Sequence, residues 1–340
     1  MQPIRTRFTD RLNVKTPIVS AAMAVPGVVD IAYAVTSAGG FGFVGNATDD
    51  SAAIKKKLSD LRTKLGVPPQ EPLPIGFGFL GWLLEKAADD DRIATVLEGR
   101  TTAIWFAFGK DIESYIKKVR AYEAGREHKT LVFVMVNSVA EALQATNEWK
   151  VDALVVQGNE AGGHGGADAP TMFSLVQGVI DAIPRNGPLL LAAGGISTGA
   201  QIAALLTMGV DAVALGTKFL FTPECTMPEE KRKVLVAADL HATTRSMAFD
   251  EVNRTMGWPD KVDGRAIRNA IITDEQEGLP LEKRLDMYDE SAKKGEKDRL
   301  VIWAGSGAGL TNQVLPAAVV LRELHEDTVK HLKAATSLLA

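Results

Sequence analysis

A single histidine, His164, lies in the most unusual segment of the chain, residues 155–170 (VVQGNEAGGHGGADAP). The glycines that flank it are Gly162, Gly163, Gly165 and Gly166. A backbone without Cβ atoms lets a substrate and a planar cofactor approach closely, and an imidazole is the side chain best suited to proton transfer near neutral pH. A histidine in a flexible loop is more often just an exposed residue. The position of His164 after a strand-like run favours the catalytic interpretation, so we predict it to be a general base.

Two pairs of small residues follow strand-like runs later in the chain: Gly194 with Gly195, and Gly216 with Thr217. A phosphate must come close to backbone N–H groups, and a Cβ at these positions would block it. Each pair alone is explained better by an ordinary tight turn. Together, at the ends of neighbouring strands, they predict a phosphate-binding site.

Other motifs in the sequence carry less weight. Met23 ends the first strand-like run, although core packing explains a methionine equally well. GFGFLG at residues 76–81 matches G-x-G-x-x-G, but it follows the third strand-like run and no acidic residue ends the next one, so it does not predict a dinucleotide site. Cys225 is more consistent with a packed residue than with a nucleophile. No Cys/His cluster has metal-ligand spacing, so no metal site is predicted.

Eight short apolar runs in the first two thirds of the chain predict the elements that position these residues. Runs such as LVFVMV are apolar throughout rather than alternating, which is typical of parallel strands covered on both faces. The runs are residues 17–23, 41–46, 74–79, 103–109, 131–136, 153–158, 189–195 and 212–220.

Helical segments with recognisable starts and ends separate these runs. Asp50, Asp111, Ser138 and Ser197 precede amphipathic segments, and glycine follows two of them. Eight strand–helix units predict a closed (β/α)8 TIM barrel, whose active site lies at the C-terminal ends of the strands. A doubly wound open sheet is the alternative.

The pattern changes after the eighth run. Residues 222–305 contain four prolines and charge-dense helical segments, and we find no strand-like run in them. They predict a helical insert that covers the active site. Residues 1–221 and 306–340 would form the barrel domain, with amphipathic C-terminal helices that pack on its wall.

The composition excludes several classes of function. With 38 Lys and Arg against 42 Asp and Glu, the formal net charge of −4 argues against binding to nucleic acid. We find no apolar run long enough to span a membrane, and the first residues lack the apolar region of a signal peptide. We therefore expect a cytoplasmic enzyme without a membrane association. Barrels often form homodimers, and no surface patch in the sequence decides whether this chain does.

In chain order, these motifs resemble the nitronate monooxygenase family, formerly called 2-nitropropane dioxygenases. The resemblance covers about residues 1–310. It is carried by PIVSAAM (17–23), QGNEAGGHGG (157–166), AAGGI (192–196), and LGTKF (215–219) followed by PEC (223–225).

The resemblance implies a TIM barrel that binds FMN without a covalent bond. It implies that His164 is the catalytic histidine and that the backbone of Met23 lies near the flavin ring. Gln157, Gly162 and Gly163 would contact the flavin ring or its ribityl chain. The phosphate of FMN would bind to Gly194, Gly195, Gly216 and Thr217.

The implied activity is oxidation of an alkyl nitronate with O2 to a carbonyl compound and nitrite. His164 could also abstract the α-proton of a neutral nitroalkane, a step that only some family members perform. The closest alternative is an NAD(P)H-dependent FMN reductase on the same barrel, such as an NADH:quinone reductase or a flavin-type enoyl-acyl-carrier-protein reductase.

Overall fold

Eight parallel strands form a closed barrel in the part of the chain that the computed structural model describes, residues 2–86 and 90–339. Their order around the barrel is β1-β2-β3-β4-β5-β6-β8-β9, and β1 pairs with β9 to close it. The predicted TIM barrel is confirmed and the open sheet is excluded. The strands are β1 (Ile18–Ser20), β2 (Phe41–Asn46), β3 (Leu73–Leu80), β4 (Thr101–Ala107), β5 (Leu131–Val136), β6 (Ala153–Gln157), β8 (Leu189–Ala193) and β9 (Ala212–Leu215).

Aromatic rings fill one end of the barrel interior. Phe43 packs edge-on against Phe41, Trp105 and Phe133, with ring centroids 5.1 to 5.2 Å apart. A Cβ at Gly76 of β3 would overlap the Phe43 ring, so this glycine makes room for it. Phe8, on the helix that precedes β1, covers the same end. The barrel can therefore be open only at its other end, where the strands finish.

The helices around the barrel begin and end at residues that the sequence marks. Asp50 accepts a hydrogen bond from the N–H of Ala53, and Gly66 ends the same helix in the left-handed conformation. The predicted caps Asp111 and Ser138 are also confirmed. At the fourth site the cap is Thr198, one residue after the predicted Ser197, because Thr198 forms a reciprocal capping box with Gln201.

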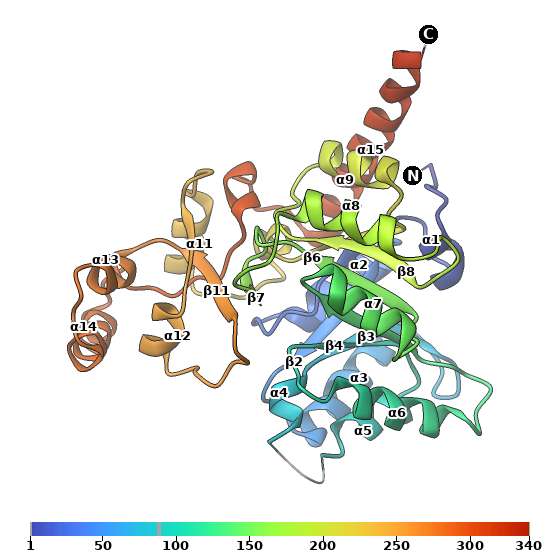
Figure 1. Cartoon of the computed structure of the whole chain (residues 1–340), viewed down its shortest axis with the longest axis horizontal. Helices are drawn as coiled ribbons and strands as arrows, with labels where there is room; N and C mark the ends of the chain where they lie inside the picture. Colours follow the sequence, from blue (N-terminus) through green and yellow to red (C-terminus); the bar gives the residue numbers. More distant parts are fainter. Residues whose placement is uncertain (1, 87–89, 340) are drawn as a thin grey trace.

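These helices lie outside the strands (Figure 1). They are α1 (Arg7–Leu12), α2 (Val28–Ser37), α3 (Ser51–Leu65), α4 (Gly81–Leu84), α5 (Arg92–Glu98), α6 (Ile112–Glu123), α7 (Val139–Asn147), α8 (Met172–Ala182), α9 (Gly199–Met208) and α10 (Thr217–Leu220). α10 occupies the end of the eighth run, which we predicted to continue as strand to residue 220.

The chain ends in a 3-10 turn, η1 (Ser306–Leu310), the long helix α15 (Ala317–Thr336) and a second 3-10 turn, η2 (Ser337–Leu339). Pro316 precedes the first turn of α15. α15 packs on α9 and α2, and its last turns project beyond the barrel (Figure 1).

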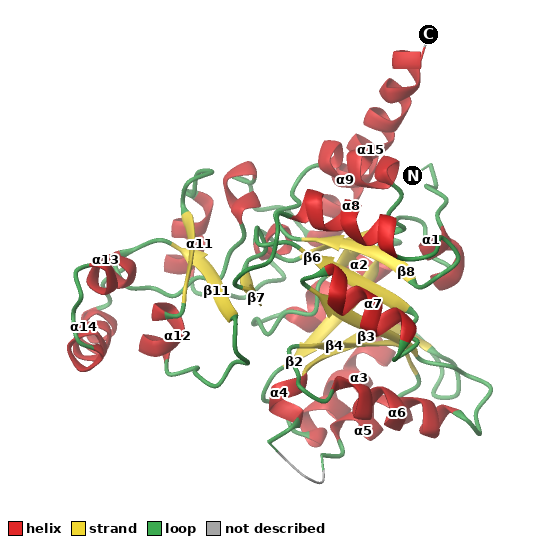
Figure 2. Ribbon diagram, viewed as in Figure 1, coloured by secondary structure: helices red, strands yellow, loops and turns green. Residues whose placement is uncertain are grey.

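The segment after β9 contains two strands as well as helices, so the expectation that it has no strand was wrong. It comprises α11 (Glu229–Val236), β10 (Thr243–Ser246), α12 (Ala248–Asn253), β11 (Val262–Ile267), α13 (Ala270–Gln276) and α14 (Leu281–Lys294). β11 lies between β10 and β7 (Gly163–Gly166), and both pairings are antiparallel. Figures 1 and 2 show this small sheet between the barrel and the outer helices. β7 belongs to the barrel half of the sequence, so the sheet joins the two parts.

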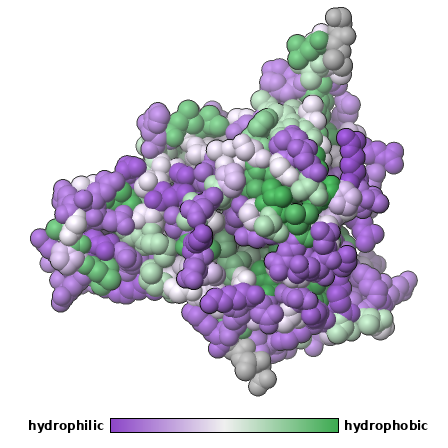
Figure 3. Space-filling view, in the orientation of Figure 1, coloured by the Kyte–Doolittle hydropathy of each residue, from purple (hydrophilic) through white to green (hydrophobic). Residues whose placement is uncertain are grey.

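The outer end of the insert, on the left in Figure 3, is mostly hydrophilic. Among the described residues, no helix combines the length and apolar character that crossing a membrane requires. The same residues contain no group of three or more His, Cys, Asp or Glu side chains that could hold a metal ion.

A buried carboxylate connects the closing strands at the N-terminal end of the barrel. Asp211, before β9, accepts hydrogen bonds from the N–H of Leu190 at 2.8 Å and from the guanidinium of Arg7 at 2.6 and 2.9 Å. Its side chain is 8% exposed, and its hydrogen bond to Arg7 raises the pKa of that guanidinium. We expect Asp211→Asn to lower the free energy of unfolding by about 2 kcal/mol, because charge-assisted hydrogen bonds at a buried site are lost.

Urea unfolding measures this difference. Asp10→Asn is the matched control, because it removes the exposed pair of Asp10 with Arg5, whose side chains are 55% and 85% exposed. Equal free energies of unfolding for the two variants would contradict the role assigned to Asp211.

Candidate active site

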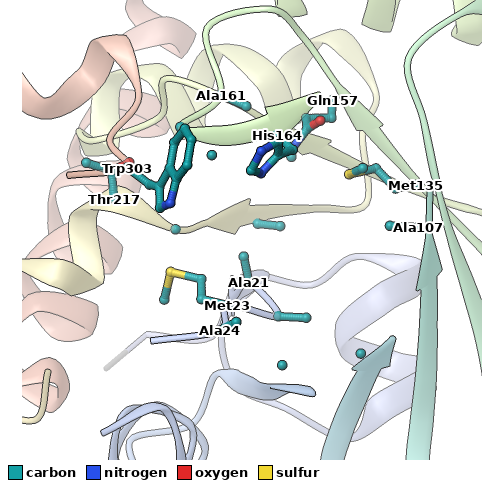
Figure 4. A pocket seen from close by; sticks show the side chains of 18 of the residues that line it. Ala21, Met23, Ala24, Ala107, Met135, Gln157, Ala161, His164, Thr217 and Trp303 are labelled. Atoms are coloured by element: carbon teal, nitrogen blue, oxygen red, sulfur yellow. The ribbon is translucent and has the colours of Figure 1, made fainter. Parts of the chain in front are cut away.

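A cavity of about 340 Å³ opens at the C-terminal ends of the barrel strands. Strand ends and the loops that follow them form most of its wall, and Thr255, Trp258 and Trp303 of the insert complete it. Figure 4 shows the rings of His164 and Trp303 on one side, with Met23 across from them. The residues predicted from the sequence all line this one cavity: Met23, Gln157, Gly162, Gly163, His164, Gly194, Gly195, Gly216 and Thr217. Their individual roles stay predictions.

The segment around His164 is a strand rather than a bare loop. It forms β7, in which His164 lies opposite Gly264 of β11. A Cβ at Gly264 would overlap the Trp303 ring, and a Cβ at Gly165 would lie 2.9 Å from Oε1 of Gln157. Glycine is therefore needed on both strands for close packing around the histidine, in addition to any contact with a ligand.

Two arginines of the small sheet fix the backbone that leads to His164. Arg245 of β10 donates to the carbonyl of Gly165 at 2.9 Å and also pairs with Asp263. Arg265 of β11 donates to the carbonyl of Asn159 at 3.0 Å. Burial lowers the pKa of Arg265, and the positive charge of Arg245 lowers it further. Hydrogen bonds from charged donors to carbonyls are among the stronger ones, so this segment is held from the insert side.

His164 is enclosed by a carboxylate and two indole rings. Its Nε2 lies 2.9 and 3.0 Å from the two carboxylate oxygens of Asp250, which is fully buried. The imidazole stacks on Trp258 at a centroid distance of 3.5 Å and an interplanar angle of 12°. Trp303 lies at 4.7 Å and is tilted. This environment keeps water away from an imidazole whose side chain is only 10% exposed.

Another part of the cavity wall consists of glycines and a threonine hydroxyl. Gly194 and Gly195 have φ of +110° and +68°, in the region that favours glycine, and a Cβ at Gly195 would lie 3.0 Å from Oγ of Ser306. The hydroxyl of Thr217 accepts a hydrogen bond from the N–H of Gly305 at 2.9 Å. Because a hydroxyl has one donor as well as its acceptor positions, Thr217 keeps a hydrogen to donate to an anion.

The middle of the cavity is lined by Met23 and Gln157. Asn137 donates to Oε1 of Gln157 at 3.1 Å, so the NH2 group of Gln157 is the part left to serve an acceptor. The backbone of Met23 packs where a Cβ of Gly45 would lie, and the sulfur of Met23 lies 3.4 Å from the Cβ position of Gly216. These groups give this part of the cavity an apolar wall with one free amide donor.

Sequence reasoning missed Asp250, Thr255 and Trp258. They lie in a segment that was interpreted only as a cover, and no spacing rule connects them to His164. The aromatic residue in GWPD, residues 257–260, was a weak signal that could have pointed to a wall of the site.

The fully buried Cys225 is a packed residue, as predicted, and burial raises the pKa of its thiol. His325, in the charge-rich helix α15, is also fully buried, with Nε2 2.6 Å from the carbonyl of Gln2.

Comparison with known proteins gives consistent relatives. Residues 5–327 match the family model described as nitronate monooxygenase. A nitronate monooxygenase of Neurospora crassa is 31% identical over 95% of this chain and 92% of its own length. The structure of FabK from Thermotoga maritima has a TM-score of 0.77 at 27% identity and covers 99% of this chain and 98% of its own. Nitroalkane oxidase from Streptomyces ansochromogenes has a TM-score of 0.76 at 26% identity, with 96% and 99% covered.

The hydrogen bond from Arg265 predicts a measurable change in the segment that leads to His164. Arg265→Met keeps the aliphatic part of the side chain but removes the shorter of two guanidinium hydrogen bonds to the carbonyl of Asn159, the other being from Arg245 at 3.3 Å. We expect amide hydrogen exchange in residues 158–166 to become about tenfold faster, because a hydrogen bond from a charged donor contributes about 1.5 to 3 kcal/mol.

Exchange followed by mass spectrometry tests this expectation. Arg268→Met, at an exposed position of the same region, is the control. Unchanged exchange in Arg265→Met, or the same increase in both variants, would contradict it.

Proposed function

Because the chain belongs to the nitronate monooxygenase family, we propose that its cavity binds FMN and that it oxidises alkyl nitronates with O2 to a carbonyl compound and nitrite. The observation that carries this proposal is the arrangement of the cavity. A buried imidazole lies in one part of its mostly apolar wall, and a glycine-lined cradle forms another.

The residues of the cavity fit the chemistry of FMN. We assign its phosphate to Gly194, Gly195, Gly216 and Thr217, where side chains are absent or carry a hydroxyl. The positive φ angles and the crowded Cβ positions of the first two are specific reasons for glycine. Gln157 would donate to an acceptor on the ring edge or ribityl chain, beside Gly162 and Gly163, and Met23 would pack near the ring.

The flavin, when bound, supplies the transfer of electrons between the nitronate and O2. The chain itself orients the nitronate and excludes water through Trp258, Trp303 and Phe108, which line the cavity. For a neutral nitroalkane, we assign His164 the role of the base that removes the α-proton. A nitronate has already lost that proton, so its oxidation does not need the base.

We assign residues 222–305 the role of an insert that covers the active site, and residues 1–221 with 306–340 the role of the flavin-binding barrel. This boundary, the cytoplasmic location and a homodimeric assembly stay predictions.

The activity is tested on the purified protein with its flavin. We expect oxygen uptake and nitrite release when ethyl nitronate or propionate 3-nitronate is added in air without any nicotinamide. In the absence of O2, NADH should not bleach the flavin rapidly. Rapid bleaching by NADH without nitrite from a nitronate would contradict the proposal and favour a reductase on the same barrel.

The phosphate cradle is tested at Gly216. Its φ of −101° lies outside the region that favours glycine, and the nearest atom to a Cβ would be the sulfur of Met23 at 3.4 Å, so Gly216→Val changes the cavity more than the backbone. We expect the dissociation constant for FMN to rise about tenfold or more, measured by fluorescence titration of the apoprotein.

Gly125→Val is the matched control, because nothing lies within 4 Å of a Cβ at Gly125. Full flavin retention in Gly216→Val would overturn this assignment of the phosphate.

A further inference from the structure

We infer that Asp250 is a positioning residue that holds the proton of His164 on Nε2, so that Nδ1 is the nitrogen that accepts the substrate proton. The inference rests on the proposed function for its catalytic meaning, but the protonation pattern that it assigns can be observed independently. It also makes the insert part of the active site rather than only its cover.

The hydrogen bonds around Asp250 determine the direction of its bond to His164. Its Oδ1 accepts from the hydroxyl of Thr255 at 2.7 Å and from the indole N–H of Trp258 at 3.1 Å. The indole nitrogen can only donate, so Asp250 accepts here as a carboxylate. An ionised carboxylate only accepts hydrogen bonds. Nε2 of His164, at 2.9 Å from Oδ2, must therefore be the donor.

This bond leaves one nitrogen of His164 for chemistry. A neutral imidazole carries one hydrogen, and here Nε2 holds it, so the lone pair lies on Nδ1. The ring is prevented from turning over by Trp258, stacked at 3.5 Å, and by Trp303 at 4.7 Å. The stacked face of Trp258 and the carboxylate also stabilise the imidazolium that forms when Nδ1 takes a proton.

The assigned step is balanced without an additional reactant. The Cα–H bond of a neutral nitroalkane breaks, and a new N–H bond forms at Nδ1. The electron pair of the C–H bond stays on the substrate as the nitronate, so nothing is oxidised in this step. Asp250 keeps its hydrogen bond to Nε2 throughout and does not become protonated.

The variant Asp250→Asn should reverse the tautomer. The amide oxygen can still accept from Thr255 and Trp258, which places the amide NH2 group where Oδ2 was, facing His164. An Nε2–H would then face this NH2 group at 2.9 Å, and the repulsion between the two donors favours moving the single hydrogen of the imidazole to Nδ1, although the amide oxygen stays 3.0 Å from Nε2. The variant therefore has nearly the same shape but lacks a basic nitrogen in the right place.

Nitrogen-15 spectra of protein labelled at histidine test the tautomer directly. The signals of His164 are identified by their loss in His164→Asn. We expect the Nε2–H form in the unchanged protein and the Nδ1–H form in Asp250→Asn. Asp289→Asn is the control, because it removes a half-exposed carboxylate on α14 that pairs with Arg254. This variant should keep the Nε2–H form. An Nδ1–H form in the unchanged protein would overturn the inference.

Kinetics with two substrates test the consequence for catalysis. For Asp250→Asn we expect kcat/KM on a neutral nitroalkane to fall about 100-fold or more, while oxidation of the preformed nitronate changes by about twofold or less. Asp250→Glu, which restores a carboxylate, should recover part of the lost activity. An equal loss on both substrates would show a structural role and overturn the inference.

The two assays separate the inference from the proposed function. If the unchanged protein does not oxidise nitronates, the proposed function fails. The nitrogen-15 spectra still confirm or overturn the assignment of Asp250 in that case.

Discussion

The pairing of β7 with β11 is the interaction on which the active site depends. β7, a strand of four residues that follows β6 in the chain, forms the edge of a sheet whose other strands come from the insert. This pairing brings Asp250 to His164, from which it is 86 residues distant in the chain, and carries Trp258 to the face of the imidazole. The barrel alone would provide a cavity and a histidine, but neither a partner for Nε2 nor a stacked ring to keep water out.

Glycine has two roles in this site that are difficult to separate from the sequence. Gly216 leaves space beside the cavity, as expected for a residue that lets a ligand approach, whereas a Cβ at Gly195 would crowd Glu160 and Ser306. Gly162 lies so close to the backbone of Gly305 that a Cβ there would overlap it, and Gly264 makes room for Trp303. The glycine-rich segment is therefore a packing requirement as well as a binding motif. Counting its glycines as ligand contacts overstates how many of them face the ligand.

The barrel could be predicted from the sequence because its signals are local. The apolar runs and the caps at Asp50, Asp111 and Ser138 act within a few residues of themselves. β10 and β11 have the sequences TTRS and VDGRAI, which carry no apolar run, and their stability comes from pairing and from the bonds of Arg245 and Arg265. The candidate cavity residues were found from motifs after the strands, whereas Asp250 depends on contacts that no spacing rule describes.

The two halves of the proposed chemistry are supported by different parts of the chain. The anion cradle is built mainly from the ends of β8 and β9, with donors fixed by the barrel backbone. The proton chemistry belongs to His164, whose partner, stacking ring and backbone hydrogen bonds come from the insert. A hydrogen bond between an imidazole and a carboxylate that indole rings enclose is stronger than it would be in water, so small movements of the insert would change the base more than the cofactor site. A change in the insert would therefore alter the proposed use of neutral nitroalkanes more than the proposed flavin binding and nitronate oxidation.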